Sequence, residues 1–381
     1  MKEKSVVTKV FLGIALLASI AGAFYVTQTL FTLDKKSQEA KESARSANIN
    51  ITVISAPECT SCFNVTNAIA SMKKQNILMQ EEKVVTYNSS EGQDLIKQFG
   101  IKVVPTYIAT GEIAKKNIES FIRDNGEVSD NTFIFTKVVP VYITTENNQE
   151  VGKVLVTHLV DSTCVGCINL KNTIGAYKKS GIAIVEEKEF SWNSEEGQKL
   201  IQQYAIEKIP TFIMSSDIAF YDIIKNSWQN VGTVESDGTY IARNIPLPYR
   251  DVSKGIVGLV DVIYLNDASC KECYRPEEVH KNILTQGFGI GIRSEKSLDL
   301  VTAAGKNLIA KYNITQVPTL LMSPQVSEYV NLKEIWSQVG TVEKDGWYVF
   351  RQLDQIGNVG YKDLNTNQVV LPQPSSENNL P

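Results

Sequence analysis

The sequence predicts three tandem α/β domains behind one N-terminal membrane-spanning helix. Three observations support this prediction. An apolar segment near the N-terminus carries no charge, a Cys-x-x-Cys pair recurs three times, and strand-length runs of β-branched residues alternate with helical patterns around each pair. A length of 381 residues agrees with two or three domains.

The composition is that of globular material, with 21% charged and 43% hydrophobic residues. A net charge of -4 argues against a nucleic-acid partner, because such a partner requires a concentrated basic face. The chain has only two histidines, His158 and His280, so chemistry that needs several imidazoles is not expected. His280, in the helical stretch after Cys273, is expected to be exposed and to have no role. All six cysteines belong to the three pairs.

The apolar segment at 10–31 is long enough to cross a bilayer of roughly 30 Å. We therefore expect a short cytoplasmic tail at 1–9, a transmembrane signal-anchor at 10–31 and a polar stem at 32–48. The protein would be a single-pass protein of the cell membrane whose C-terminal domains are extracytoplasmic, either periplasmic or at the cell surface. Signal cleavage near Ala23, giving a secreted protein, is the alternative. The anchor is favoured because the apolar run continues beyond Ala23.

Internal repetition defines the domains. The first cysteines of the pairs, 105 and 106 residues apart, are Cys59, Cys164 and Cys270. An apolar-Pro-Thr segment follows 46, 46 and 48 residues later, at Pro105, Pro210 and Pro318. At this period each copy is a whole domain, and the expected domains are 49–152, 153–257 and 258–371. We expect residues 372–381 to form a disordered tail.

Each copy has the same expected order of elements. A β-branched strand precedes the pair, as at 50–55, and a helical pattern follows it. A second strand leads to a short helix that opens at a serine, a plausible cap. The apolar run after Pro-Thr is a third strand, and Asp-Gly at 237–238 and 345–346 predicts a hairpin. This alternation indicates an α/β sandwich.

The position of the cysteines suggests redox chemistry. In each copy the first cysteine is expected where a strand passes into a helix, and a helix N-terminus favours a thiolate. The second cysteine would lie one turn deeper on the same face. The predicted nucleophiles are therefore Cys59, Cys164 and Cys270, and the predicted resolving thiols are Cys62, Cys167 and Cys273.

A strand, a Cys-x-x-Cys pair, a helix and a later apolar-Pro-Thr resemble the thioredoxin-fold superfamily. Three successive units resemble the multidomain protein disulfide isomerase-like and disulfide-bond-formation-like proteins. The resemblance implies a cis-proline beside each pair, in a loop that holds a substrate chain by backbone pairing. The matching residues are Val104 with Pro105, Ile209 with Pro210, and Val317 with Pro318.

This sequence also departs from the family. The acid that thioredoxins bury six residues before the first cysteine is replaced by Val53, His158 and Tyr264. His158 is a candidate for proton transfer in the second copy, although a core histidine is the favoured interpretation. Because the interiors of the pairs also differ from those of well-known members, the three sites are expected to differ in redox potential.

Structural disulfides, zinc binding and copper relay are the alternatives to a redox role for the pairs. Purely structural disulfides across such short loops would add little stability, which favours a redox role. Zinc commonly takes four ligands from two nearby pairs, whereas these pairs lie a domain apart with no histidine beside them. Copper relay would be expected to use methionines. No metal site and no cofactor are therefore expected.

The predicted function is a membrane-tethered, extracytoplasmic enzyme, a thiol-disulfide oxidoreductase. The expected partners are protein substrates with thiols or disulfides, an unidentified redox partner, and the membrane through the N-terminal helix. Whether the enzyme oxidises, reduces or isomerises is not resolved by the sequence. The alternative is a non-catalytic three-domain binding or scaffold protein with structural disulfides.

Overall fold

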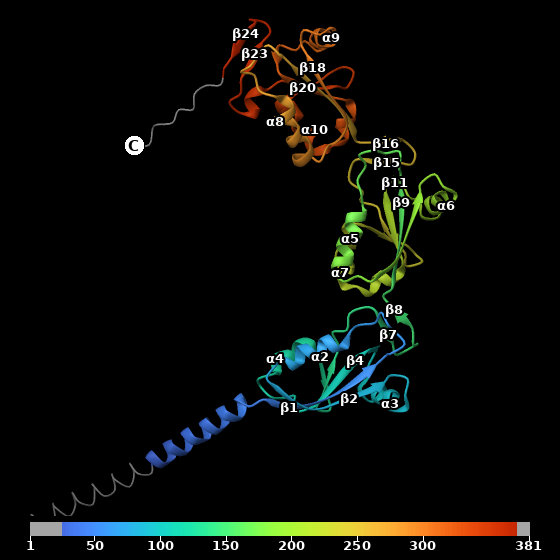
Figure 1. Ribbon diagram of the computed structural model, residues 1–381, viewed down its shortest axis with the longest axis vertical. Helices are drawn as coiled ribbons and strands as arrows, with labels where there is room; N and C mark the ends of the chain where they lie inside the picture. The colour runs from blue at the N-terminus through green and yellow to red at the C-terminus, as the bar shows by residue number, and fades with distance from the viewer. Residues whose placement is uncertain (1–24, 372–381) are drawn as a thin grey trace, which may run out of the picture. The chain divides into compact units, whose positions relative to one another are not determined.

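The computed structural model describes residues 25–371, which divide into two compact parts, 25–152 and 153–371. The first part contains one α/β repeat and the second contains two (Figure 1). The three repeats are called here repeat 1 (47–151), repeat 2 (154–257) and repeat 3 (259–370). The predicted tail at 372–381 lies outside the described residues, and the exact boundaries of three domains stay a prediction.

Repeat 1 follows the predicted order of strand, pair, helix, strand, helix and strand. Its elements are β1 (Ala47–Ser55), α2 (Val65–Lys73), β2 (Ile77–Thr86), α3 (Ser90–Phe99), β3 (Val103–Val104), β4 (Thr106–Gly111), α4 (Glu119–Asn125), β5 (Gly126–Ser129), β6 (Thr132–Phe135), β7 (Tyr142–Thr144) and β8 (Glu150–Val151). The last two strands form a short hairpin that the sequence did not predict.

Repeats 2 and 3 have the same plan with extra helical turns after the third long strand. Repeat 2 contains β9 (Val154–Val160), α5 (Lys171–Lys179), β10 (Ile184–Ser191), α6 (Glu195–Tyr204), β11 (Lys208–Ile209), β12 (Thr211–Met214), η1 (Ser216–Phe220), α7 (Asp222–Lys225), η2 (Trp228–Asn230), β13 (Gly232–Val234), β14 (Tyr240–Ala242), β15 (Tyr249–Asp251) and β16 (Gly255–Val257). Repeat 3 contains β17 (Leu259–Asn266), α8 (Pro276–Asn282), η3 (Ile283–Gly287), β18 (Gly291–Asp299), α9 (Ala303–Tyr312), β19 (Gln316–Val317), β20 (Thr319–Met322), η4 (Pro324–Glu328), α10 (Val330–Val339), β21 (Gly340–Val342), β22 (Tyr348–Phe350), η5 (Leu353–Ile356), β23 (Tyr361–Asp363) and β24 (Gln368–Val370).

Each repeat is built on a mixed five-stranded sheet. In repeat 1 the strand order is β2-β1-β4-β6-β5, with β1 and β2 parallel and the other neighbours antiparallel. The orders β10-β9-β12-β14-β13 and β18-β17-β20-β22-β21 are equivalent. A second, three-stranded sheet completes each repeat, in the orders β3-β7-β8, β11-β15-β16 and β19-β23-β24.

Helices cover both faces of the five-stranded sheet, as repeat 2 in Figure 1 illustrates. Ile174 of α5 and Ile224 of α7 pack with Phe212 on one face. Ile201 of α6 packs with Leu159 on the other. Full burial of one such side chain stabilises the fold by roughly 1.5–3 kcal/mol. The α/β sandwich predicted from the alternation of patterns is therefore confirmed.

The second helix of each repeat is fixed by a serine or threonine and a glycine. The Ser89 hydroxyl caps α3 by accepting a hydrogen bond from the Gly92 N–H at 3.1 Å. A Cβ on Gly92 would lie 2.2 Å from the Thr86 carbonyl oxygen, so the helix can approach the preceding strand only with glycine there. Ser194 with Gly197 and Thr302 with Gly305 form the same caps.

An arginine closes the other end of this helix in repeats 2 and 3. The guanidinium of Arg351 donates to the carbonyl oxygens of Tyr312 and Asn313, at 2.7 and 3.3 Å, and to Glu343 and Thr341. Arg243 makes the equivalent four contacts in repeat 2. A cation at a helix C-terminus satisfies the last carbonyls and interacts favourably with the helix dipole.

An exposed helix at 25–44 precedes repeat 1, so the predicted polar stem is helical over most of its length. Its end is tied to the repeat, because Glu112 accepts hydrogen bonds from Arg45 at 3.0 Å and from the Asn48 N–H at 2.7 Å. Within residues 25–371, none of the helices combines the length and apolar character that a bilayer crossing needs. Residues 10–24 of the predicted span lie outside the described residues.

We predict that Arg351→Lys lowers the free energy of unfolding of repeat 3 by about 1–3 kcal/mol, because a lysine keeps the charge but cannot bond both helix carbonyls, Thr341 and Glu343 at once. Urea unfolding with hydrogen–deuterium exchange of 340–351 measures the effect. Arg275→Lys is the control, since its side chain is 78% exposed. Equal stability of the two variants would contradict a structural role for the arginine contacts.

Candidate redox site

All six cysteines are paired as three disulfides, each between the two cysteines of one Cys-x-x-Cys. In every repeat the pair lies in the turn that joins the first strand to the first helix. In repeat 1 this turn links β1, which ends at Ser55, to α2, which begins at Val65. The predicted placement of each pair directly after a strand is confirmed.

The prediction that the second cysteine lies one helical turn deeper is wrong. The helices begin after the pairs, at Val65, Lys171 and Pro276. Local chemistry explains the delay. The Asn64 side chain caps α2 by accepting from the Thr66 N–H, and Pro276 occupies the first turn of α8, a position that suits a residue with no N–H to donate. The cysteines therefore do not lie in the first turn of a helix, and the helix N-terminus no longer explains why a thiolate would be favoured there.

Cis-prolines stand in all three repeats, as the resemblance implied. The peptide bonds before Pro105, Pro210 and Pro318 are cis. In repeat 2, Pro210 lines a pocket of about 240 Å³ together with both cysteines, Cys164 and Cys167. In repeat 3, the hydroxyl of Tyr274, next to Cys273, donates to the Pro318 carbonyl at 3.2 Å. In repeats 2 and 3 the cis-proline therefore lies close to the segment that carries the cysteine pair.

The unpredicted hairpin of each repeat pairs with the two residues before the cis-proline. Val104 is opposite Ile143 in the β3–β7 ladder, and two residues along the ladder the Thr145 N–H donates to the Lys102 carbonyl. Hydrogen-bonded and non-hydrogen-bonded pairs alternate along an antiparallel ladder. The backbone N–H and C=O of Val104 therefore point at Ile143. Repeats 2 and 3 have the same register, with Ile209 opposite Arg250 and Val317 opposite Lys362.

This pairing bears directly on the predicted substrate-binding residues. Val104, Ile209 and Val317 are all 0% exposed, and the prolines that follow them are buried. While the hairpin is in place, their backbone cannot pair with a substrate chain. The backbone groups that the resemblance assigned to a substrate are satisfied within the chain itself.

In repeats 1 and 2 the two cysteines of a pair differ in exposed fraction. Cys59 and Cys164 are buried, at 9% and 7% exposed, while Cys62 and Cys167 are half-buried. In repeat 3 both cysteines are half-buried. An incoming thiolate would reach the second sulfur more easily in repeats 1 and 2, so burial does not favour the predicted order of nucleophile and resolving thiol. That order stays a prediction.

A buried ion pair links the hairpin to the cysteine turn in repeats 2 and 3. Arg250 of β15 contacts the carboxylate of Asp161 at 2.6 Å, three residues before Cys164. Lys362 of β23 contacts Asp267 at 2.9 Å, three residues before Cys270. The carboxylates are almost completely buried, and they also accept hydrogen bonds from the Thr163 and Ser269 N–H groups at 2.9 Å.

Opposing effects set the pKa values of these two acids. Burial is the largest effect on the pKa of Asp161 and raises it, but hydrogen bonds from Thr163 and Arg250 together outweigh burial and lower the pKa below its ordinary value. The pKa of Asp267 is lowered in the same way, with Ser269 and Lys362 overcoming burial. Both carboxylates are therefore charged at neutral pH.

Repeat 1 replaces this ion pair. Ala56 and Ile143, both buried, occupy the positions of the acid and the cation. Glu150, opposite Ile143 in the hairpin, places its Oε1 3.0 Å from Cys59 Sγ and accepts a hydrogen bond from the Ser61 hydroxyl at 2.9 Å. Sequence reasoning missed Glu150. A comparison of the three hairpins could have indicated it. The charged residue lies on the first strand in repeats 2 and 3, as Arg250 and Lys362, and on the second strand in repeat 1, as Glu150.

His158 is a core histidine, as the favoured interpretation held. It is 3% exposed on β9, and its Nε2 lies 3.1 Å from Glu187 Oε2. It also lines the pocket that contains Cys164 and Cys167. A role in proton transfer to those sulfurs stays a prediction.

His280 is buried at 3% exposed, although the sequence had suggested an exposed position. Its Nε2 lies 3.1 Å from the Tyr274 hydroxyl, and its ring packs edge-on against Phe350. The error arose because α8 carries a Pro-Glu-Glu start that resembles a solvated helix. Burial lowers the pKa of His280 to about 4, so the imidazole is neutral at physiological pH.

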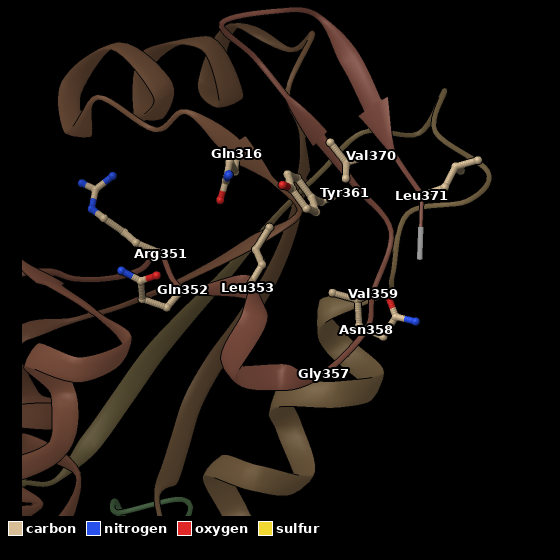
Figure 2. Close-up of a pocket in the computed structure, with 10 residues that line it drawn as sticks. All are labelled: Gln316, Arg351, Gln352, Leu353, Gly357, Asn358, Val359, Tyr361, Val370 and Leu371. Carbon is tan, nitrogen blue, oxygen red and sulfur yellow. The ribbon is translucent and has the colours of Figure 1, made fainter. Parts of the chain in front are cut away.

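A further pocket, of about 290 Å³, lies in repeat 3 between the end of β22 and the β23–β24 hairpin (Figure 2). Gln316, Arg351 and Gln352 give it a polar wall, and Val359 and Tyr361 lie on the other side. No cysteine lines it. Because the Arg351 guanidinium is already engaged by the helix end, this pocket is not part of the candidate redox site.

No family model matches the sequence, and no curated protein matches it. Among solved structures, ERdj5 form II is similar at 10% identity and a TM-score of 0.15, over 73% of this chain and 38% of ERdj5. Human ERp44 form I has 12% identity and a TM-score of 0.14, covering 78% of this chain and 84% of ERp44. A protein disulfide oxidoreductase from Aeropyrum pernix K1 has 13% identity and a TM-score of 0.13, over 45% of this chain and 77% of that one.

These TM-scores assign neither a family nor an activity to the chain. The thioredoxin-like character of each repeat is instead visible in its own geometry. A parallel β1–β2 pair flanked by antiparallel strands, a cysteine pair after the first strand and a cis-proline before the third long strand recur in all three repeats.

We predict that Arg250→Ile lowers the free energy of unfolding of repeat 2 by about 3–5 kcal/mol, because it leaves the Asp161 carboxylate buried without its cation. The double variant Asp161→Ala/Arg250→Ile copies Ala56 and Ile143 of repeat 1, and should recover most of that loss. Urea unfolding measures both variants. A double variant as unstable as the single one would show that the ion pair is not what couples the two positions.

We predict a pH-dependent stability from His280. Its pKa is about 4 in the folded chain and about 6.5 when unfolded, so between these values the unfolded state binds more protons. Stability should therefore fall as the pH drops from about 6.5 to about 4, by about 1–3 kcal/mol. His280→Gln should flatten the slope of unfolding free energy against pH in this window. An unchanged slope would contradict the assignment to His280.

Proposed function

We propose that the protein is a thiol-disulfide oxidoreductase with three dithiol–disulfide couples. The observation that carries the proposal is that all six cysteines form three short-range disulfides, each in the same strand-to-helix turn and with at least one half-buried cysteine. A disulfide across two intervening residues closes a very small loop and adds little stability. Such a bond is better suited to opening and closing than to holding a fold.

The proposed step is an exchange of two electrons. A substrate thiolate attacks one sulfur of the pair, the disulfide opens, and a mixed disulfide forms. A second substrate thiolate then displaces the pair. The substrate gains a disulfide, while the pair becomes a dithiol and takes up two protons. The reverse sequence reduces a substrate disulfide, and a redox partner must restore the pair in either direction.

The three couples should not be equivalent. In repeat 1 the carboxylate of Glu150 lies beside Cys59, whereas the acids near the pairs of repeats 2 and 3 form ion pairs with Arg250 and Lys362. A carboxylate beside a thiol raises the pKa of that thiol. The thiolate form then contributes less to the stability of the reduced pair. We infer that the first couple differs in reduction potential from the other two.

The place of action is part of the proposal. Disulfides persist in oxidising compartments and are rare where glutathione and thioredoxin keep thiols reduced. Together with the apolar stretch at 10–31, this supports an extracytoplasmic, membrane-tethered protein. The substrates would then be exported proteins with thiols or disulfides.

A second candidate is a non-catalytic scaffold with structural disulfides. The observation that favours it is the burial of the cis-proline loops beneath their hairpins, which removes the backbone contact expected for a substrate chain. Under this hypothesis the disulfides would close the turns and the repeats would bind partners through other surfaces.

A redox titration separates the two candidates. We expect the cysteines of the folded full chain to become alkylatable across a glutathione series at potentials above about -300 mV, because structural disulfides resist reduction to below about that value. Disulfides that stay closed throughout would support the scaffold.

Insulin reduction then identifies the working repeats. We expect Cys62→Ser, Cys167→Ser and Cys273→Ser to trap or abolish turnover in their own repeats, and the matching Cys59→Ser, Cys164→Ser and Cys270→Ser variants to show which sulfur accepts the substrate. Full activity after loss of all three pairs would contradict the proposal. Comparing mixed-disulfide yields for the two sulfurs of one pair also decides which one is the nucleophile.

A further inference from the structure

We propose that the reduced cysteines of repeat 1, Cys59 and Cys62, bind Zn²⁺ together with Glu150. The site goes beyond the proposed redox function and rests on it in one respect, namely that this disulfide can be opened. Its ligand atoms are the two Sγ atoms and a carboxylate oxygen. A fourth position remains for water or for a group from a partner.

The donor atoms are already gathered. Glu150 Oε1 lies 3.0 Å from Cys59 Sγ, and the three donor atoms all lie within 4.8 Å of one another. Zinc bonds of roughly 2.0–2.3 Å in tetrahedral geometry place neighbouring ligand atoms about 3.3–3.8 Å apart. Opening the disulfide lets the two sulfurs separate toward this spacing, while the carboxylate needs to move little.

The carboxylate is held in place for such a role. The Ser61 hydroxyl, which lies between the two cysteines in sequence, donates to Glu150 Oε1 at 2.9 Å. Residue 150 is also fixed by the β7–β8 ladder, in which it faces Ile143. Residues that orient a ligand in this way contribute to metal affinity. Two thiolates and a carboxylate are donors that zinc accepts.

The other two repeats lack this donor set. In their hairpins the position of Glu150 is taken by Ile256, opposite Arg250, and by Val369, opposite Lys362. Directly opposite residues of an antiparallel pair share a face, so these positions face the cysteine turn as Glu150 does. Among the described residues, the cysteine pairs of repeats 2 and 3 have no third cysteine, histidine or acidic donor gathered with them as Glu150 is with Cys59 and Cys62. Repeats 2 and 3 are therefore internal controls.

Metal and disulfide exclude each other at this site. A dithiol or phosphine reductant supplies two electrons, two protons are taken up, and the S–S bond becomes two thiols. Binding of Zn²⁺ then releases both thiol protons as the thiolates become ligands. The bound sulfurs cannot form a disulfide until the metal leaves. Zinc would hold repeat 1 in its reduced state.

The experiment uses the full chain carrying Cys164→Ser, Cys167→Ser, Cys270→Ser and Cys273→Ser, so that only the pair of repeat 1 remains, and the unsubstituted chain beside it. Each protein is reduced with a phosphine and titrated with ZnCl₂ against a chromophoric chelator. Co²⁺ is the spectroscopic probe, because tetrahedral thiolate coordination has a characteristic absorption. We expect one metal ion per chain at this site when reduced and none when oxidised.

Two glutamate variants test the third ligand in the unsubstituted chain and in the four-serine chain. Glu150→Gln should weaken Zn²⁺ binding at least about tenfold, since even residues that only orient a metal ligand cost that much. Glu146→Gln removes the same charge from the turn of the same hairpin and should leave affinity unchanged. Equal affinities of the two variants would overturn the site.

The remaining outcomes separate this inference from the proposed function. A pair that is reduced in the folded chain but binds no metal overturns the zinc site and leaves the oxidoreductase intact. A disulfide that resists the phosphine in the folded chain overturns both for repeat 1. Metal bound equally well by the chain with Cys59→Ser and Cys62→Ser overturns the assignment to these residues.

Discussion

The pairing of each short hairpin with the two residues before the cis-proline is the constraint on which the rest of the site depends. In repeat 1, Ile143 occupies the backbone groups of Val104, and this contact fixes the hairpin across the cysteine turn. The hairpin covers the buried proline loop and brings one of its side chains against the cysteine turn. Access of a substrate chain to the proline loop and the charge beside the cysteine turn therefore both depend on this backbone ladder.

Charge at the turn is balanced differently in the three copies of the same architecture. Repeats 2 and 3 bury an acid on the turn and a cation on the hairpin, at Asp161 with Arg250 and at Asp267 with Lys362. Repeat 1 has apolar residues at both positions and an exposed carboxylate, Glu150, one strand over. Each solution is internally consistent, because no buried charge lacks its partner. The surroundings of three nearly identical sulfur pairs therefore diverge while the backbone stays the same.

The sequence was sufficient for those features that depend on local patterns. Strand-length β-branched runs, the caps at Ser89 and Ser194, and the three-fold repetition are short-range signals, and all were predicted correctly. The first helix was predicted to include the second cysteine. In repeat 1 it begins later, at Val65, because Asn64 caps it. Glu150 was missed because 91 residues separate it from Cys59, and only the hairpin register brings the two together. Long-range pairing of two-residue strands leaves too weak a pattern to predict.

The ion pairs between turn and hairpin also determine how the repeats can be combined. Moving the cysteine turn of repeat 2 into repeat 1 would place an aspartate opposite Ile143, and the reverse exchange would leave Arg250 facing an alanine. Either chimera would enclose a charge with nothing to neutralise it. The cysteine turn and its distant hairpin are therefore one structural unit. A transfer of the cysteine pair to another protein would require both segments together.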